Sequence, residues 1–181
     1  MAFPQEKTYT IEDIYRLPEG TRAELIDGQI YDMAPPSRTH QELSFGIGLE
    51  IGNYIQKKRG LCKVYAAPFA VFLNKDDRTY VEPDLSVICD LSKLNDKGCY
   101  GAPDWIIEIV SPGNPEHDYI TKLYKYRLAG VREYWIVDPG TKCVTVYFFE
   151  MGILARQYTF HDKISANIYD DLTIDFSQFA L

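Results

Sequence analysis

Apolar positions recur at helical spacing in the segment from His40 to about Gln56. They form one stripe, because residues three or four positions apart share a face of a helix: Leu43, Ile47, Ile51, Tyr54 and Ile55. Ser37 or Thr39 can cap the start of this helix, and Lys57-Lys58-Arg59-Gly60 place cations and a glycine at its end. The pattern predicts a long amphipathic helix with His40 in its first turn, on the edge of the apolar stripe.

Two other helices, one short and one long, follow from local signals. Thr10 to Leu17 begins with a capping-box spacing, Thr10 and Asp13, and ends at Pro18. Tyr119 to Ala129 is the second long helix, and Gly130 stands at the position where a helix commonly ends in a left-handed residue.

The remaining apolar runs are short and predict strands. Asp27-Gly28 separates Arg22–Ile26 from Gln29–Met33, which is a strong signal for a two-residue hairpin. The other predicted strands are Cys62–Leu73, Val81–Cys89, Trp105–Val110, Glu133–Val137, Cys143–Phe149, Leu154–Phe160 and a weak one near Leu172–Phe176, with a loop over Asp90–Ala102. Helices interspersed with strands predict an α/β domain with a mixed sheet.

No repeat, low-complexity tract or linker divides the chain. We therefore expect one domain over residues 1–181, with an N-terminal helix and hairpin (1–36), a core (37–140) and C-terminal strands (141–181).

A lone carboxylate interrupts the most apolar of these strands, Trp105–Val110, at Glu108. Burying a carboxylate costs several kcal/mol unless it is paired, hydrogen-bonded or bound to a metal. Asp84 begins the preceding strand, and adjacent strands lie about 4.8 Å apart, so the two carboxylates can share one divalent cation. Lys122, on the helix that follows, is placed to orient a water molecule or to stabilise developing negative charge. A Ser111–Pro115 loop connects the strand to this helix.

A second Pro-Asp pair, Pro103-Asp104, competes with Pro83-Asp84. Asp104 lies four residues before Glu108, roughly 13 Å along the strand, which is too far to share an ion. We interpret it as the residue that begins the strand.

Other polar residues have both a functional and a structural interpretation. His40 could position a phosphate or a water molecule, or be a hydrogen-bonded histidine at the edge of the core. Glu24 could face the same pocket as a third acidic group. Ser111 and Asp118 are typical of helix caps, and the tyrosines Tyr124, Tyr126 and Tyr134 of core or rim aromatics. His117 and His161 have no predicted role.

Composition narrows the class of protein. A net charge of −7 argues against nonspecific coating of nucleic acid, which draws on Lys and Arg, but suits a site that gathers cations. No apolar stretch is long enough to span a bilayer, and the N-terminus lacks the layout of a signal peptide, so we expect a cytoplasmic protein. In that setting the four scattered cysteines, Cys62, Cys89, Cys99 and Cys143, are expected to be free thiols.

Several motifs occur together in a fixed order. They are Glu24-Leu25-Ile26-Asp27-Gly28, Glu82-Pro83-Asp84-Leu85, Glu108-Ile109-Val110-Ser111-Pro112, Asp118 with Lys122, and the segment 130–138, GVREYWIVD. In this order they resemble the PD-(D/E)XK nuclease superfamily and, within it, the Uma-type restriction endonucleases.

The resemblance implies a restriction-endonuclease-like core and a Mg²⁺-dependent phosphodiesterase site, in which Mn²⁺ can substitute. Asp84, Glu108 and the Ile109 carbonyl would be the metal ligands, and DNA the substrate. The third position of the motif is Val110 instead of lysine, and the resemblance implies that Lys122 takes over that role from the next helix.

Two further expectations concern activity and assembly. The alternative to a nuclease is a catalytically inactive module that uses the same fold for binding or assembly. Cations gathered in one groove beside Asp84 (Lys122, Lys125, Arg127 and Lys57–Arg59) would favour the enzyme, and scattered cations the module. A homodimer is expected, because the C-terminal strands are rich in aromatic residues (Tyr147, Phe148, Phe149, Tyr158 and Phe160).

Overall fold

The computed structural model describes residues 7–112, 116–152 and 154–179. Gly113 to Pro115, the last three residues of the predicted Ser111–Pro115 loop, lie outside the described residues. In chain order the elements are α1 (Ile11–Tyr15), β1 (Ala23–Ile26), β2 (Gln29–Asp32), α2 (Arg38–Lys58), β3 (Lys63–Ala66), β4 (Val71–Phe72), β5 (Leu85–Ile88), η1 (Leu91–Lys93), β6 (Leu94–Asn95), β7 (Gly98–Tyr100), β8 (Trp105–Ile109), η2 (His117–Lys122), α3 (Leu123–Ala129), β9 (Glu133–Asp138), β10 (Cys143–Phe148), η3 (Phe149–Met151), β11 (Ala155–Thr159), β12 (Lys163–Ser165), β13 (Thr173–Asp175) and η4 (Phe176–Gln178).

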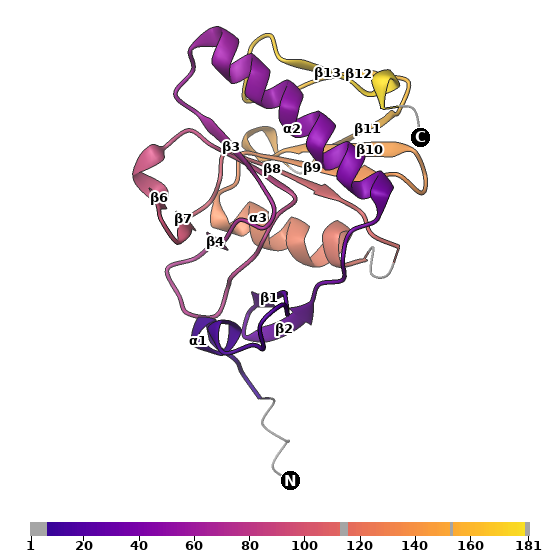
Figure 1. Cartoon of the computed structure of the whole chain (residues 1–181). Coiled ribbons are helices and arrows are strands. Elements are labelled where there is room, and N and C mark those ends of the chain that lie inside the picture. Colours follow the sequence, from indigo (N-terminus) through magenta and orange to yellow (C-terminus); the bar gives the residue numbers. More distant parts are fainter. Residues whose placement is uncertain (1–6, 113–115, 153, 180–181) are drawn as a thin grey trace.

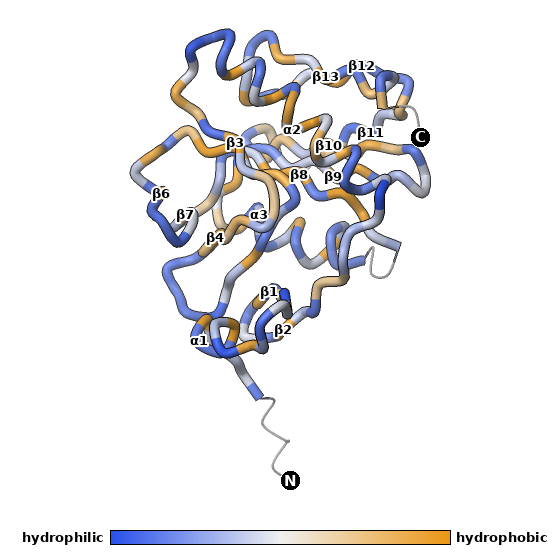
Figure 2. The backbone as a smooth tube through the Cα atoms, in the orientation of Figure 1, coloured by the Kyte–Doolittle hydropathy of each residue, from blue (hydrophilic) through white to orange (hydrophobic). Residues whose placement is uncertain are grey.

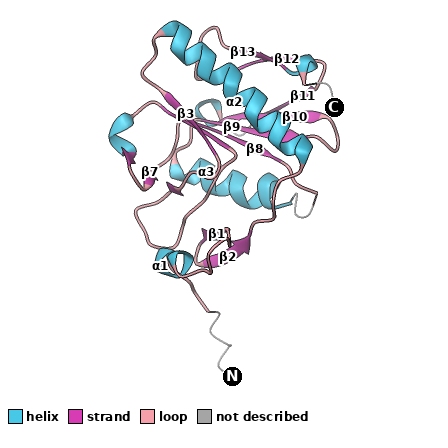
Figure 3. Ribbon diagram, viewed as in Figure 1, coloured by secondary structure: helices cyan, strands magenta, loops and turns pink. Residues whose placement is uncertain are grey.

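A six-stranded mixed sheet forms the centre of the molecule, in the order β11-β10-β9-β8-β5-β3. Only β8 and β9 run parallel; the other neighbours pair antiparallel. Helices lie on both sides of the sheet, with α2 on one side and α3 on the other (Figures 1 and 3). The predicted α/β class with a mixed central sheet flanked by helices is confirmed.

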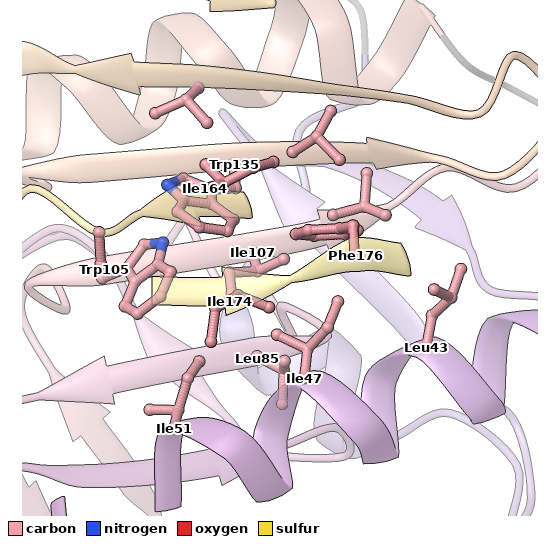
Figure 4. Packing of buried hydrophobic residues seen from close by; sticks show 14 of the residues in the cluster. Leu43, Ile47, Ile51, Leu85, Trp105, Ile107, Trp135, Ile164, Ile174 and Phe176 are labelled. Atoms are coloured by element: carbon pink, nitrogen blue, oxygen red, sulfur yellow. The ribbon is translucent and has the colours of Figure 1, made fainter. Parts of the chain in front are cut away.

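The face beneath α2 carries the larger apolar cluster. The stripe residues Leu43, Ile47 and Ile51 are fully buried and pack toward Trp105 of β8 and Trp135 of β9 (Figure 4). Hydrophobic and hydrophilic residues are interspersed along α2 (Figure 2), and the buried ones recur three or four positions apart, as in an amphipathic helix. Ser37 caps the helix by accepting a hydrogen bond from the His40 N–H.

The other face packs against α3 and the N-terminal part of the chain. Alternation along β8 places Ile106 and Val110 in the cluster that contains Tyr126 of α3, whereas Ile107 and Ile109 face α2. Since Glu108 shares the face of Ile106 and Val110, this alternation points its side chain toward η2 and α3. The predicted hairpin also lies on this side (Figure 1).

Two of the predicted strands are shorter than expected. Proline has no N–H for the ladder. Pro68 accordingly lies between β3 and β4, and Pro83 stands just before β5, which begins only at Leu85. Asp90–Ala102, predicted as a loop, contains η1, β6 and β7, and β7 pairs with β4.

Two of the cysteines are not free thiols, contrary to the prediction. Cys62 and Cys89 form a disulfide, while Cys99 and Cys143 are free. The antiparallel register that pairs Lys63 with Ile88 makes Cys62 and Cys89 the next opposed residues. Because this pairing joins residues 27 apart in the sequence, their spacing alone could not indicate it.

Within the described residues, no helix combines the length and the hydrophobicity needed to cross a membrane.

Candidate active site

The candidate site lies where β5 begins and β8 ends. The ladder between these strands stops at Leu85 opposite Ile107, so the next opposed residues would be Asp84 and Glu108. Here side chains replace the ladder bonds. The Asp84 N–H donates to Glu108 Oε2 (3.3 Å), and the Ile109 N–H donates to Asp84 Oδ2 (2.7 Å). The two carboxylates therefore converge, as the sequence predicted.

Lys122, at the end of η2, contacts Glu108 as well. Its ammonium lies 3.0 Å from Glu108 Oε1, 2.9 Å from Glu24 Oε2 and 3.5 Å from Asp118 Oδ1. Val110 stays in the apolar cluster. The η2 turn is a π-helix, wider than an α-helical turn, and it directs both Asp118 and Lys122 inward, where they are buried.

Glu24 and His40 also face this point. Glu24, from β1, accepts the Glu82 N–H at 3.0 Å in addition to its contact with Lys122. His40, from the first turn of α2, places Nε2 3.1 Å from Asp84 Oδ2. The geometry thus brings together Asp84, Glu108, Lys122, His40 and Glu24.

Asp118, His117 and Tyr126 are the residues of this cluster to which the sequence analysis gave no role in the site. Tyr126 donates a 2.5 Å hydrogen bond to Glu108 Oε1, and His117 Nε2 lies 3.6 Å from Glu24 Oε2. The sequence pattern around Asp118 is typical of a helix cap. Its spacing of four from Lys122, and that of Tyr126 beyond it, was the available signal, because such residues share one helix face.

Two other residues are placed as the sequence analysis interpreted them. Asp104 is not among the residues that line the cavity beside Asp84, and it accepts hydrogen bonds from the Cys89 N–H and from Arg132. Tyr134 is buried, and its hydroxyl donates to the Asp118 carbonyl.

The cavity above these groups has a volume of about 390 Å³. Its acidic lining residues are Glu24, Asp32, Asp84, Glu108 and Asp118, and its basic ones are Arg22, Lys122, His40 and His117. The five carboxyl groups outnumber the two permanently charged cations, so the cavity suits a cationic guest more than a bare anion.

Burial and neighbouring charges shift the pKa values of the clustered groups in different directions. Burial raises the pKa of Glu108 well above its usual value despite Lys122, and the charges of Asp84, Asp118 and Glu24 add to the effect. Although burial opposes it, the charge of Lys122, the nearby His117 imidazole and the hydrogen bond from the Glu82 N–H lower the pKa of Glu24 to about 2. For Lys122, burial lowers the pKa, but the charges of the surrounding carboxylates outweigh burial and raise that pKa well above its usual value.

His40 is held over the same point. Burial lowers its pKa, but the hydrogen bond and charge of Asp84, the charge of Asp118 and the backbone of Ile109 raise it overall. The imidazole is therefore biased toward its charged form between a carboxylate and the end of β8.

The donor set fits an open site for a hard cation. Within the described part of the chain, no three His, Cys, Asp or Glu side chains are arranged to enclose a metal ion by themselves. Mg²⁺ needs only one or two carboxylates and keeps several waters. Asp84 Oδ1, which has no hydrogen-bond partner among the described residues, and Glu108 Oε2 meet that requirement.

Comparison with known proteins finds similar solved structures and a matching family model. A solved structure described as a putative nuclease belonging to DUF820, from Anabaena variabilis ATCC 29413, superposes with a TM-score of 0.77 and 18% sequence identity, over 94% of this chain and 96% of that one. This likeness shows a shared fold. No curated protein matches the sequence.

The model of the Uma2 family, whose description is "Putative restriction endonuclease", matches residues 11–177. That span contains every candidate site residue and nearly all of the described fold. The chain belongs to the Uma2 family.

Proposed function

We propose that this protein is a Mg²⁺-dependent endonuclease that hydrolyses DNA phosphodiester bonds, with Mn²⁺ able to substitute. The observation that carries the proposal is the convergence of Asp84 and Glu108, with the ammonium of Lys122 beside them, at the floor of one cavity. A nuclease is the activity in the family description, and DNA is proposed on that ground.

Asp84, Glu108 and the Ile109 carbonyl would hold the ion. The Ile109 N–H points at Asp84, and the carbonyl of an extended residue points to the same side of the strand as its N–H. Bound Mg²⁺ would supply Lewis acidity and a lowered pKa for coordinated water.

The other groups fix these side chains in place. Lys122 is charged and held by three carboxylates, so it can meet negative charge on a phosphate without first being reoriented. Glu24 fixes Lys122 from the hairpin side, and His40 fixes Asp84 from α2.

A non-catalytic module is the second candidate, because the cations do not gather beside Asp84. Lys125 pairs with Asp27, and Lys58 pairs with Asp171. Lys58 lies eighteen residues along α2 from His40, about 27 Å at the rise of an α-helix. Lys122 is the only member of the predicted set that lines the cavity, and this scatter is the distribution that favours a module.

Plasmid cleavage separates the two functions. We expect wild-type protein to nick or linearise plasmid in Mg²⁺ or Mn²⁺ and Asp84→Ala to lose the activity. Asp104→Asn is the matched control, because it changes the other Pro-Asp pair, which does not line the cavity, and should cleave normally. Equal, background-level nicking by wild type and Asp84→Ala across salt and metal conditions would exclude the nuclease.

Calorimetric titration tests the metal site without turnover. Wild-type protein should bind Mn²⁺, and Glu108→Gln should weaken the binding by more than about 100-fold, since even residues behind the ligands are worth 10–100-fold. Unchanged Mn²⁺ binding in Glu108→Gln would remove Glu108 from the proposed site.

The homodimer also stays a proposal, but its basis changes. Phe160 is buried, and Tyr158, Tyr147 and Phe149 pack against the two clusters instead of forming an exposed aromatic surface. The exposed apolar residues nearby are Met151 and Leu154, beside the edge strand β11. Sedimentation that shows only monomer at micromolar concentration would refute the dimer.

A further inference from the structure

Arg22 enters the cavity from the segment just before β1. Its backbone carbonyl accepts the Met33 N–H, which ties it to the hairpin, and about one third of its side chain is exposed. Arg22 and Glu24 are two residues apart, so both project from the same side of the chain, roughly 7 Å from each other. Since Glu24 contacts Lys122, this spacing places the guanidinium beside the candidate active site, on the cavity wall.

A fixed network orients this guanidinium. Its Nε donates to Glu82 Oε2 at 3.0 Å and its Nη2 to the same oxygen at 2.5 Å. Tyr80 donates to the other oxygen, Glu82 Oε1, at 2.7 Å, and the Glu82 N–H is held by Glu24. Glu82 therefore cannot turn without breaking contacts on both of its oxygens.

The network leaves part of the guanidinium available. Arginine has five N–H donors, and two of them are used by Glu82. The Nη1 group has no partner among the described residues. Lys122, the other permanently charged cation of the cavity, is in contact with three carboxylates.

The N-terminus of helix α2 is a second feature of the cavity that favours an anion. The 21-residue helix α2 begins at the cavity, because the lining includes residues just before and within its first two turns: Pro36, His40, Gln41 and Ser44. A helix N-terminus carries partial positive charge. The carboxylate of Asp32, which also lines the cavity, opposes this positive charge, and a directed donor such as Arg22 is therefore the more necessary.

We propose that Arg22 is the phosphate-binding residue of the cavity, which donates from Nη1 to a non-bridging oxygen of the substrate backbone. This inference rests on the proposed nuclease function and adds the residue that holds the phosphodiester. The planar fork of arginine suits a phosphate oxygen, and the pairing with Glu82 fixes the fork before substrate arrives.

An ion pair can also be purely structural, and Arg132 provides the comparison. It pairs with Glu150 and Asp104, and 40% of its side chain is exposed, similar to Arg22, but it does not line the cavity. If Arg22 only neutralised Glu82, the two arginines would behave alike toward DNA.

The test is the salt dependence of DNA binding. The full chain is titrated against a short fluorescein-labelled duplex in Ca²⁺, and fluorescence anisotropy gives Kd over a range of salt concentrations. The variant is Arg22→Met with Glu82→Gln, which removes the guanidinium without leaving a buried carboxylate unpaired. Thermal melting checks that it folds.

We expect this double variant to bind about tenfold more weakly at low salt. We also expect the slope of log K against log salt to become shallower by about 0.9, the value for one lost phosphate contact on duplex DNA. Glu82→Gln alone should keep the wild-type slope, because the guanidinium remains. Arg132→Met with Glu150→Gln should keep both slope and affinity.

The outcomes separate this inference from the proposed function. If wild type binds DNA and the Arg22→Met, Glu82→Gln protein binds with the same slope and affinity, the role of Arg22 is overturned and the proposed nuclease function is not. The absence of any wild-type binding and cleavage would overturn both. Equal losses in the Arg22 and Arg132 double variants would show a general charge effect and also overturn it.

Discussion

Two buried glutamates on neighbouring strands, Glu108 of β8 and Glu133 of β9, have opposite kinds of surroundings. Both are almost inaccessible to solvent, with 3% and 0% of their surface exposed. Burial raises the pKa of each. Glu133 lies on the face that contains Trp135, whereas Glu108 faces Tyr126.

Neutral donors surround Glu133. Its two oxygens accept hydrogen bonds from the Asn167 and Ile168 N–H groups, the Asn167 amide and the Trp135 indole, at 2.7 to 2.9 Å. These contacts fasten the segment before β13 onto the sheet. Glu133 is not among the residues that line the cavity.

Other ionisable groups surround Glu108 instead. Lys122 and Tyr126 contact one oxygen, while Asp84, Asp118 and Glu24 raise its pKa by their charge. The contrast teaches that burial of a carboxylate does not by itself indicate chemistry. Repulsion among several carboxylates that line a cavity does indicate chemistry, because it favours the binding of a further cation.

The largest difference we expect is in stability after a neutral, isosteric substitution. Glu133→Gln replaces an acceptor by a donor where all four neighbours donate, so it should lower the free energy of unfolding by about 3 kcal/mol. Glu108→Gln relieves repulsion and should change it by less than about 1 kcal/mol. Urea denaturation measures both, and equal losses would break the distinction.

The contributions of Glu24 and Glu133 to stability should depend on pH with opposite signs. The pKa of Glu24, in the cavity cluster, falls from 4.5 to about 2 on folding. Its contribution, about 3 kcal/mol by linkage, is therefore present above pH 4.5 and is lost as the pH falls toward 2. The pKa of Glu133 is raised above 4.5, so its contribution is complete below pH 4.5 and is lost as the pH rises through the folded value.

Unfolding free energies across this pH range, for wild type, Glu24→Gln and Glu133→Gln, test the signs. Glu24→Gln should flatten the loss of stability in acid, and Glu133→Gln should leave that acid limb in place. An acid limb in Glu24→Gln identical to that of wild type would contradict the assignment.

The smallest effect concerns the hydroxyl that holds Glu108. Tyr126→Phe removes the 2.5 Å hydrogen bond to Glu108 Oε1, and we expect kcat for cleavage to fall about tenfold with KM unchanged. Tyr134→Phe is the matched control, because its hydroxyl bonds the Asp118 carbonyl and not a proposed metal ligand. Each variant should lose about 1 kcal/mol of stability. If kcat fell by a similar factor in Tyr126→Phe and Tyr134→Phe, the role of Tyr126 would be structural only.

Local signals in the sequence predicted much of the fold. The stripe of α2, the Asp27-Gly28 hairpin and the end of α3 at Gly130 are all confirmed. Each depends on residues within a few positions of one another, where periodicity and backbone conformation act directly. Errors arose where pairing is distant, as in the Cys62–Cys89 disulfide and the pairing of β4 with β7.

The candidate site divides in the same way. Glu108 was identifiable because a charge in an apolar strand conflicts with its neighbours, and Asp84 because it begins the adjacent strand. Arg22 and His117 carry no such conflict, since isolated charged or polar residues near turns are ordinary. Glu133 is the opposite case. It stands at the start of a predicted strand, where a charged residue can be either exposed or buried, so the sequence did not predict that it is buried.

The sequence by itself determined the long helix α2, the β1–β2 hairpin, the alternating faces of β8 and the presence of a carboxylate that needed a partner. Only the tertiary structure decided which partners meet it, because those groups come from β1, α2, β5, η2 and α3, and chain distance does not predict where they converge. It also decided that Glu108 faces competing charges while Glu133 faces fixed donors. The free energy of a buried carboxylate depends on which groups lie around it, and packing sets those groups.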